Sequence, residues 1–293
     1  MQWIERCLKS CVPYAVIVID NNSEDETVQY ISEHFKNVQL IKSDKNIGFG
    51  KANNLGIKYA LQKDYDYVFL LNQDAYLQEE SLQKLLSFQI ENPEFGILSP
   101  IHMNGKKDRL DLNFSNYMHY KKNPDFYSDY VLKRTLKPVY DVPFVNAAAW
   151  LLSKKLIETV GGFDPLFFHY GEDENYCQRA TYHGFKIGVI PDTFICHDRE
   201  NRKSPVVEPY SDMYYALLER NSKLKYANIN NSGGLNELQV EITRIERTLF
   251  KLKLKTKFDK AKAVKKQLEL IRKITPFIRE SREFNILKGR THM

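Results

Sequence analysis

Short apolar runs alternate with helical patterns along the first 100 residues of the chain. The runs at 14–19, 38–41, 67–71 and 95–100 are rich in Val, Ile, Leu and aromatic residues, and the segments between them carry apolar residues at helical spacing. Strands buried on both faces of a sheet read as such continuous apolar runs. We therefore predict an α/β fold with a mostly parallel sheet flanked by helices.

Beyond the run at 67–71, the pattern predicts a helix over 77–90. Residues 101–140 then break the alternation, because they are polar and rich in Tyr, Asn and Lys, and we expect hairpins and loops there. Strand character returns at 142–152 and at 186–190, where the second strand is expected to end before a proline.

The chain turns helical after residue 210. A linker at 228–234 is followed by two segments with apolar residues at helical spacing. From residue 233 to the last residue there are 16 Lys or Arg against 7 Asp or Glu, so the formal net charge of +6 is concentrated here. We predict an α/β domain over 1–227 and a basic amphipathic helical extension over 235–293.

Composition excludes several protein classes. Among the 293 residues there is no uncharged apolar run of about 18 residues, which a membrane-spanning helix needs. Residues 1–6 lack the apolar core of a signal peptide. The four cysteines, Cys7, Cys11, Cys177 and Cys196, show no metal-type clustering. We therefore expect free thiols in a cytoplasmic protein.

Polar side chains follow several of the predicted strands at the point where each strand ends. They lie at 20–23, at 72–74 and at 197–198. In open α/β sheets, ligands bind just beyond the carboxyl ends of the strands. Asp74 would therefore hold a metal ion or a polar ligand, or else it caps the helix that follows. His197 is either a metal ligand or a buried core histidine.

A second acidic cluster lies at Glu172, Asp173 and Glu174, at the start of a predicted helix. Acidic residues favour helix N-termini, so capping is one explanation. Three adjacent acids exceed what capping needs, and four aromatic residues lie within 163–170. A carboxylate in apolar surroundings has a raised pKa, which suits a general base.

Four segments, taken in order, resemble family 2 glycosyltransferases of the GT-A fold. The segments are 18–25, 46–56, 70–75 and 161–179, and the resemblance extends over about residues 1–225. The Asn-Gln-Asp-Ala form of the third segment is most similar to the rhamnosyltransferase-like branch of that family. The resemblance implies an inverting transfer of a sugar from a nucleotide-diphosphate sugar to an acceptor hydroxyl.

By position, the resemblance also assigns a nucleotide site. Asp20 and Asn22 would contact the base or ribose, and Gly48 and Asn53 would lie along the nucleotide. Gly48 belongs to a turn before a helix, whose N–H groups could meet a phosphate, although the turn matches no known glycine motif. Asn146 lies in a segment that would line the floor beneath donor and acceptor.

The resemblance implies a metal ion and a base. Asp74 would bind Mg²⁺ or Mn²⁺ through the donor diphosphate, and Asn72 stands where the family's Asp-x-Asp motif has its first acid. His197 matches a position that supplies a further metal ligand in some relatives. Asp173 would accept the proton of the acceptor hydroxyl, and Glu172 is the second choice for this base.

The function expected on this basis is sugar transfer in cell-surface polysaccharide or glycolipid synthesis, with a saccharide or lipid-linked saccharide as acceptor. One alternative is a truncated, inactive homologue that acts as a nucleotide-sugar-binding or a membrane or protein interaction module. Another is a nucleotidyltransferase, which would want a Gly-rich basic loop after its first strand. Nucleic-acid binding is not expected, because the acids at the strand ends would repel phosphate.

Two features fall outside the α/β pattern. The helices of the extension either pack on the α/β domain or pair as a helical hairpin, or they form a basic surface that docks on anionic lipid at the inner face of the cytoplasmic membrane. Family members also open with a strand and a turn that should precede Trp3, and the chain offers no room for them after Met1. We expect a missing upstream segment of roughly 10 residues, which would make Met1 an internal methionine. Otherwise the protein lacks a central strand and part of its nucleotide site.

Overall fold

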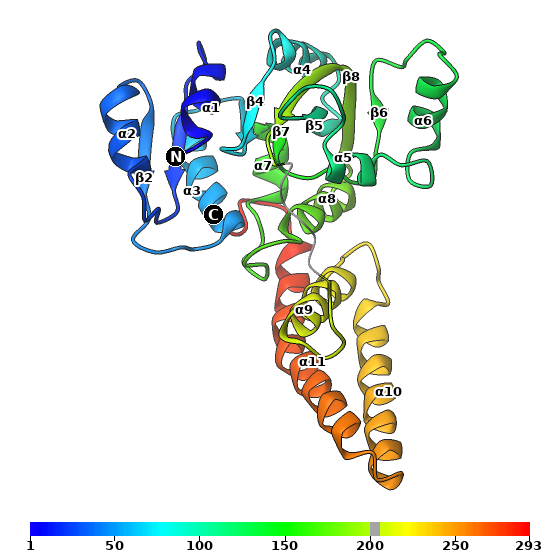
Figure 1. The fold of residues 1–293 in the computed structure, drawn as a ribbon. Coiled ribbons are helices and arrows are strands. Elements are labelled where there is room, and N and C mark those ends of the chain that lie inside the picture. The colour runs from blue at the N-terminus through cyan, green and yellow to red at the C-terminus, as the bar shows by residue number, and fades with distance from the viewer. Residues whose placement is uncertain (200–205) are drawn as a thin grey trace.

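The computed structural model describes residues 1–199 and 206–293. An α/β part contains the sheets, and a bundle of long helices projects away from one side of it (Figure 1). The chain passes from the first part to the second near residue 211 and returns at its end, so that the last residues lie against the α/β part.

The α/β part contains two sheets. The larger one has the strand order β3-β7-β5-β8-β4, with β6 paired to β8. Its strands are β3 (Tyr67–Leu71), β4 (Ala75–Leu77), β5 (Phe95–Asn104), β6 (Tyr140–Asp141), β7 (Ala149–Ser153) and β8 (Lys186–His197). The smaller sheet pairs β1 (Ile17–Asp20) with β2 (Gln39–Lys42).

The α/β class is confirmed, and the strand pairings are mixed. β1 with β2 and β5 with β8 run parallel, whereas the other pairs in the larger sheet are antiparallel. Two registers position the site. Leu71 pairs with Ala149, and Ala75 pairs with His197. The turn between β3 and β4 is thereby held next to the start of β7 and the end of β8.

Helices surround both sheets. In the α/β part they are α1 (Ile4–Ser10), α2 (Thr27–His34), α3 (Phe49–Gln62), α4 (Ser81–Glu91), α5 (Leu112–Tyr117), α6 (Pro124–Val131), α7 (Lys154–Val160) and α8 (Glu172–Tyr182). The expectation of hairpins and loops over 101–140 is confirmed only in part, because Met103 pairs antiparallel with Leu110 but α5 and α6 also lie there. Asp111 caps α5 and Pro124 opens α6.

Three expected boundaries also differ. The helix expected over 77–90 begins only at Ser81, because the short strand β4 comes first. The strand expected over 142–152 is confined to β7, since Pro143 has no N–H to donate to a ladder. β8 continues past Pro191 to His197, and a register shift against β5 accommodates the interruption.

An aromatic core joins the sheet to α8. The side chains of Trp150 on β7, of Phe163 in the loop after α7 and of Tyr176 on α8 are fully buried. Their ring centroids lie 4.9 to 6.2 Å apart. Burial of large aromatic rings dominates core energetics. This cluster fixes the position of α8, and hence of the acidic residues at its start, relative to the end of β7.

The helical part consists of α9 (Asp212–Tyr226), α10 (Gly234–Leu254) and α11 (Phe258–Asn285). α10 and α11 form a hairpin with a core of its own, built from Leu238, Ile242 and Ile245 of the first helix and Val264, Leu268, Ile271, Ile274 and Ile278 of the second. Tyr226 of α9 joins the same core. The amphipathic helices expected from the sequence are present, while the domain boundary at 227 stays a prediction.

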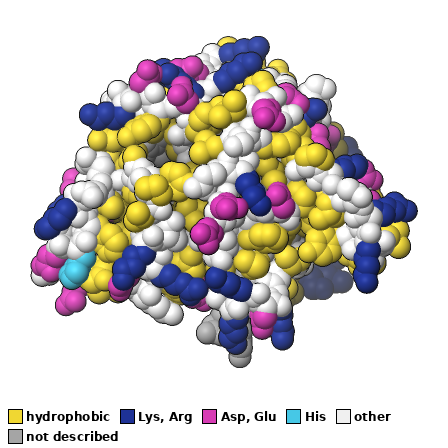
Figure 2. All heavy atoms as spheres, turned by 90° about the horizontal axis from the view of Figure 1, so that it is seen from above, with side chains coloured by type: hydrophobic (Ala, Val, Ile, Leu, Met, Phe, Trp, Pro, Cys, Tyr) yellow, Lys and Arg dark blue, Asp and Glu magenta, His cyan; other side chains and the backbone are white. Residues whose placement is uncertain are grey.

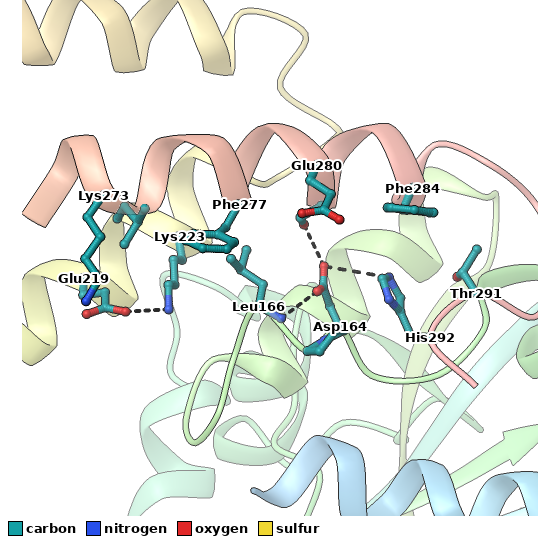
Figure 3. Close-up of a pocket in the computed structure, with 13 residues that line it drawn as sticks. Asp164, Leu166, Glu219, Lys223, Lys273, Phe277, Glu280, Phe284, Thr291 and His292 are labelled. Atoms are coloured by element: carbon teal, nitrogen blue, oxygen red, sulfur yellow. Dashed lines mark hydrogen bonds and ion pairs between the residues drawn. The ribbon is translucent and has the colours of Figure 1, made fainter. Parts of the chain in front are cut away.

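Polar contacts tie the hairpin to the α/β part. Ser281 and Asn285 of α11 each donate to Asp164 at 2.7 Å, and the Gly162 N–H donates to the Thr291 carbonyl at 2.8 Å. Beside them lies a cavity of about 610 Å³, into which Asp164 and His292 point (Figure 3). Neither this cavity nor the smaller one beside α9 includes Asp74 or Asp173 among its lining residues.

Two further expectations from composition can be compared with the structure. The four cysteines are free thiols, as predicted. None of the helices in the described ranges has the length and apolar character that crossing a membrane requires.

Candidate active site

The turn between β3 and β4 holds Asn72 and Asp74 at the end of the sheet. The Asn72 N–H donates to the Ala148 carbonyl at 2.9 Å, and the Asp198 N–H donates to the Asp74 carbonyl at 2.7 Å. Asp74 is 5% exposed. It does not cap the next helix, because α4 begins at Ser81 with Glu80 at its N-cap. The capping explanation for Asp74 is therefore wrong.

His197 ends β8 directly against this turn. Its Nε2 lies 3.3 Å from Asp74 Oδ1, and its Nδ1 lies 3.6 Å from Asp111 Oδ2. The imidazole is fully buried, and neither ring nitrogen has a hydrogen-bond partner within the described residues. A buried polar atom without a partner costs free energy, and a cation held by Nε2 and Asp74 Oδ1 would provide Nε2 with a partner.

The Asp74–His197 pair fits two neighbouring ligands of a divalent cation. Ligand atoms at about 2.1 Å from an octahedral ion and at right angles lie about 3 Å apart, close to the observed 3.3 Å. Among the described residues no set of three His, Cys, Asp or Glu could hold a metal. Substrate phosphates and waters would then complete the shell, as is usual for Mg²⁺. The metal role of both residues stays a prediction.

Sequence reasoning missed three residues in this part of the structure, namely Asp111, Tyr117 and Arg199. Asp111 Oδ1 accepts the Phe114 N–H, which caps α5, while its Oδ2 faces His197 and lies 3.9 Å from Arg199 Nε. Tyr117 packs edge-on against Phe144 with ring centroids 4.8 Å apart. Burial, followed by the charge of Asp173, raises the pKa of Tyr117 to about 12. The cap at Asp111 was the one available signal, and it lay in a segment expected to be loops.

Asp173 lies at the start of α8, with backbone donors on its carboxylate. The Glu174 N–H donates to its Oδ1 at 2.8 Å, and the Ala147 N–H also donates to the carboxylate. Burial nevertheless raises the pKa of Asp173 to about 6. The residue as a whole is partly exposed, while its carboxylate is enclosed by protein. A carboxylate with a pKa near neutrality is suited to accept a proton.

Glu172 differs from its neighbour in the hydrogen bonding of its carboxyl group. It is buried, and its Oε2 has no hydrogen-bond partner among the described residues. Burial, followed by the negative charge of Asp173, raises the pKa of Glu172 to about 7. Asn146 lies next to the Ala147 donor, and it too is buried with an unpartnered Oδ1. The segment before β7 therefore meets the start of α8, as the site prediction requires.

The predicted nucleotide residues lie on one connected turn system. Asn21 organises it: its Nδ2 donates to Asn46 Oδ1 at 3.0 Å, and its Oδ1 accepts the Ile47 N–H at 2.9 Å. Asp20 accepts the Ser23 N–H at 3.3 Å, while Asn22 is exposed with a φ of 67°. Sequence reasoning chose the two flanking residues and missed the one that joins the turns.

The other two predicted nucleotide residues begin α3. Gly48 has a φ of +84°, and a Cβ there would collide with the Phe168 carbonyl oxygen, so only glycine fits. Asn53 donates to the Phe49 carbonyl at 3.0 Å within the helix. Its neighbour Asn54 is buried and bonds both the N–H and the carbonyl of Phe163. Nucleotide contacts of Gly48 and Asn53 stay predictions.

Arg179 lies on the same helix as the acidic cluster, but its guanidinium group bonds elsewhere. It is fully buried and donates to the carbonyl oxygens of Gly162, at 2.6 Å, and Val160. These carbonyls lie at the end of α7, where helix termini leave acceptors unsatisfied. Arg179 is therefore a structural residue of the Gly161–Gly162 turn.

The family model of glycosyl transferase family 2 matches residues 2–161, which are 160 of the 293 residues. The chain belongs to glycosyl transferase family 2. This membership confirms the resemblance to family 2 glycosyltransferases that the four sequence segments indicated.

Relatives of the chain include rhamnosyltransferases. The dTDP-rhamnosyl transferase RfbF of Shigella flexneri is 26% identical over 186 residues, which cover 62% of this chain and 59% of RfbF. The N-acetylglucosaminyl-diphospho-decaprenol L-rhamnosyltransferase of Mycobacterium tuberculosis is 23% identical over 235 residues, covering 72% and 76%. The rhamnosyltransferase-like branch is thereby confirmed. This chain spans less than two thirds of the length of RfbF.

A solved structure confirms the fold. GalNAc-T7 in complex with UDP, GalNAc and Mn²⁺ superposes with a TM-score of 0.53 at 13% identity, covering 78% of this chain and 49% of GalNAc-T7. At this identity the likeness concerns the GT-A fold alone.

Proposed function

We propose that this family 2 chain transfers a sugar from a nucleotide-diphosphate sugar to an acceptor hydroxyl, with inversion at the anomeric carbon. The observation that carries the proposal is the convergence of two groups at one end of the sheet. One is the buried Asp74–His197 pair, and the other is the Asp173 carboxylate, which accepts the Ala147 N–H just before β7 and whose pKa is raised to about 6. Family membership disfavours the nucleotidyltransferase alternative.

At the donor side, Asp74 and His197 would hold Mg²⁺ or Mn²⁺ against the diphosphate. Such an ion, when bound, neutralises the negative charge that develops on the departing nucleotide diphosphate. Asp111 would act as a positioning residue, because its carboxylate faces His197 Nδ1 and favours the tautomer that leaves Nε2 free toward Asp74. Asn72 orients the turn through its backbone bond to Ala148.

At the acceptor side, Asp173 would act as the base. The acceptor oxygen forms a bond to the anomeric carbon from the face opposite the diphosphate, the bond from that carbon to the diphosphate oxygen breaks, and the hydroxyl proton moves to Asp173. Backbone donors of Glu174 and Ala147 fix the orientation of the Asp173 carboxylate. Glu172, whose Oε2 has no hydrogen-bond partner among the described residues, is the second candidate.

The nucleotide would lie along the turns that Asn21 joins. Asp20 and Asn22 would contact the base or ribose, and Gly48 and Asn53 would follow the nucleotide toward the diphosphate. Asn146 would bind a sugar hydroxyl, because its buried Oδ1 has no hydrogen-bond partner among the described residues.

The named relatives suggest the substrates to test first. RfbF is a dTDP-rhamnosyl transferase, so dTDP-rhamnose is the first donor. The mycobacterial relative acts on a lipid-linked saccharide, which supports an acceptor of that class and a role in glycan synthesis. The excess positive charge of the helical extension supports contact with an anionic membrane on the cytoplasmic side.

The test is a panel of nucleotide sugars, including dTDP-rhamnose, assayed with Mn²⁺, with the product anomer assigned by NMR. We expect Asp173→Asn to lower kcat at least 100-fold with little change in KM, and wild-type kcat to fall as the pH drops through about 6. Glu174→Gln, which removes a charge from the same helix turn, is the matched control. A retained anomeric configuration, or an unchanged kcat in Asp173→Asn, would refute the mechanism.

A further inference from the structure

Exposed apolar side chains gather at the far end of the helical hairpin. Phe250, Leu254 and Phe258 are 63%, 69% and 68% exposed, on either side of the turn that joins α10 to α11. Leu249 and Leu252, which alternate with them, pack inward on the hairpin core. We call residues 247–262 the hairpin tip; it is the orange turn at the bottom of Figure 1, at the end of the hairpin opposite the sheets.

The hairpin tip is also strongly basic. It contains seven Lys or Arg and a single acid, Asp259, so its net charge equals the +6 of the entire chain. None of the seven forms an ion pair with a described residue. Nearer the sheets, by contrast, Lys266 pairs with Asp212 and Arg272 with Glu246. The basic side chains of the tip are thus free to meet an external anion.

The opposite end of the molecule shows what an ordinary surface of this protein looks like. There, Lys and Arg side chains are interspersed with Asp and Glu and with apolar groups (Figure 2). Apolar side chains beside unpaired cations are typical of segments that enter the boundary between lipid headgroups and acyl chains. The hairpin tip combines such exposed apolar side chains with a net charge of +6.

We propose that the hairpin tip inserts into an anionic lipid bilayer. Phe250, Leu254 and Phe258 would enter the boundary region, and the surrounding lysines would contact lipid phosphates, each adding about fivefold to the affinity. The inference deepens the proposed membrane contact and is independent of the sugar-transfer mechanism. The membrane contact is then confined to the hairpin tip and does not extend over the whole of residues 235–293.

The same features disfavour two other occupants. A second copy of the chain would bring two tips of charge +6 together, which Coulomb repulsion opposes. Nucleic acid would use the cations but would leave Leu254 without a partner, since aliphatic side chains do not stack on bases. A bilayer surface matches both the charge and the apolar groups.

The binding test uses the full chain and vesicles of phosphatidylglycerol mixed with phosphatidylcholine. Wild-type protein should co-sediment with these and at least tenfold less with pure phosphatidylcholine. Combined replacement of Phe250, Leu254 and Phe258 by Ser should lower binding at least tenfold. All three side chains are exposed, so the fold and transfer to a soluble acceptor should be unchanged.

The matched control replaces three comparably exposed apolar residues outside the tip, Ile90, Val131 and Leu132, by Ser, and it should bind as wild type. Equal loss in both triple variants, or no loss in the tip variant, would overturn the proposal. Binding to duplex DNA without binding to vesicles would overturn it in favour of a nucleic-acid surface. Concentration-dependent dimers lost in the tip variant, without vesicle binding, would overturn it in favour of a second copy.

Insertion itself is tested by fluorescence. Phe258→Trp should be quenched several-fold more by brominated anionic lipids than Tyr127→Trp, which places the probe on exposed α6. Vesicle binding without any quenching of Phe258→Trp would reduce the tip to an electrostatic contact and refute insertion. A chain that inserts but transfers no sugar would refute the proposed activity and leave this inference standing.

Discussion

The α/β part and the helical hairpin differ in whether their buried polar side chains have hydrogen-bond partners. Every buried side-chain nitrogen or oxygen without a hydrogen-bond partner, among the described residues, belongs to the α/β part. Several of them, on Asn146, Glu172 and His197, lie at the end of the sheet. In the hairpin the buried side chains are mostly apolar, and Ser281 and Asn285 have partners.

This difference follows from what each part contacts: the hairpin helices pack on each other, whereas the end of the sheet would bind a ligand. A helix satisfies its own backbone and needs only an apolar stripe against its neighbour. A ligand site must hold polar groups apart until the ligand arrives, at a cost of about 1–3 kcal/mol for each buried group left unpaired. Substitutions should therefore change ligand binding in the first part and folding stability in the second.

Asp74→Asn is expected to have the largest effect. Loss of the carboxylate charge should lower kcat/KM for the nucleotide-sugar donor about 1000-fold, because the diphosphate loses its metal anchor. Steady-state kinetics at varied Mn²⁺ would measure it. Asp192→Asn, an exposed acid paired with Lys84, is the control and should behave as wild type. A 1000-fold loss in both variants would remove the contrast.

Ile271→Ala tests the other side of the comparison. Ile271 is buried in the hairpin core, so the cavity should lower the free energy of unfolding by about 2–4 kcal/mol. Urea unfolding measures this. Leu254→Ala, at the hairpin tip, should change stability by less than about 0.5 kcal/mol. If Ile271→Ala weakened Mn²⁺ binding in the folded protein, the division between the two parts would fail.

Asp111→Asn sharpens the comparison within the site. Asparagine preserves the α5 cap but removes the negative charge facing His197 Nδ1. Mn²⁺ affinity, measured by electron paramagnetic resonance, should fall about 10- to 100-fold. Asp108→Asn, a nearby acid that bonds Asn104, is the control. Unchanged affinity in Asp111→Asn would show that Asp111 serves only as a helix cap.

The smallest effect is a pH-dependent gain in stability on Glu172→Gln. The pKa of Glu172 is raised from 4.5 to about 7 in the folded protein, so its carboxyl binds a proton more tightly when folded than when unfolded. Its contribution to stability is present below about pH 4.5 and lost as the pH rises through about 7. Glutamine stays neutral, so the variant should be more stable than wild type at pH 8, and the gain should disappear toward pH 4.5.

Thermal unfolding of wild type and variant from pH 4.5 to pH 8 measures this difference, and the lowest pH serves as the internal control. A difference that does not grow with pH would mean that Glu172 is not held in its neutral form.

The elements that sequence reasoning found are those with a repeating pattern. The apolar runs gave the strands, and α10 and α11 are long enough to show helical spacing over several turns. α5 and α6 are only 6 and 8 residues long, so their apolar residues, Phe114 and Phe126 among them, form no visible period. An apolar run also carries no sign of whether its partner strand is parallel, which is why the mixed pairing could not be foreseen.

The candidate site was foreseen where the functional residue ends a strand, as with Asp74 and His197. It was missed where the role depends on segments that meet only in the fold. Asp111 matters because it lies beside His197, 86 positions later, and no local pattern announces that contact. The role of Arg179 could not be seen for the same reason, since its acceptors are the carbonyl oxygens of residues 160 and 162.

Asp164 has a consequence for how the protein can be dissected. Its buried carboxylate receives hydrogen bonds from Ser281 and Asn285 of α11, so removing the hairpin would take away two of its donors and uncover the surface on which α11 packs. A truncated enzyme would then lose sheet stability together with the hairpin. The two parts should melt in one cooperative transition, and in thermodynamic terms the hairpin is not a detachable anchor but part of the folding unit that carries the site.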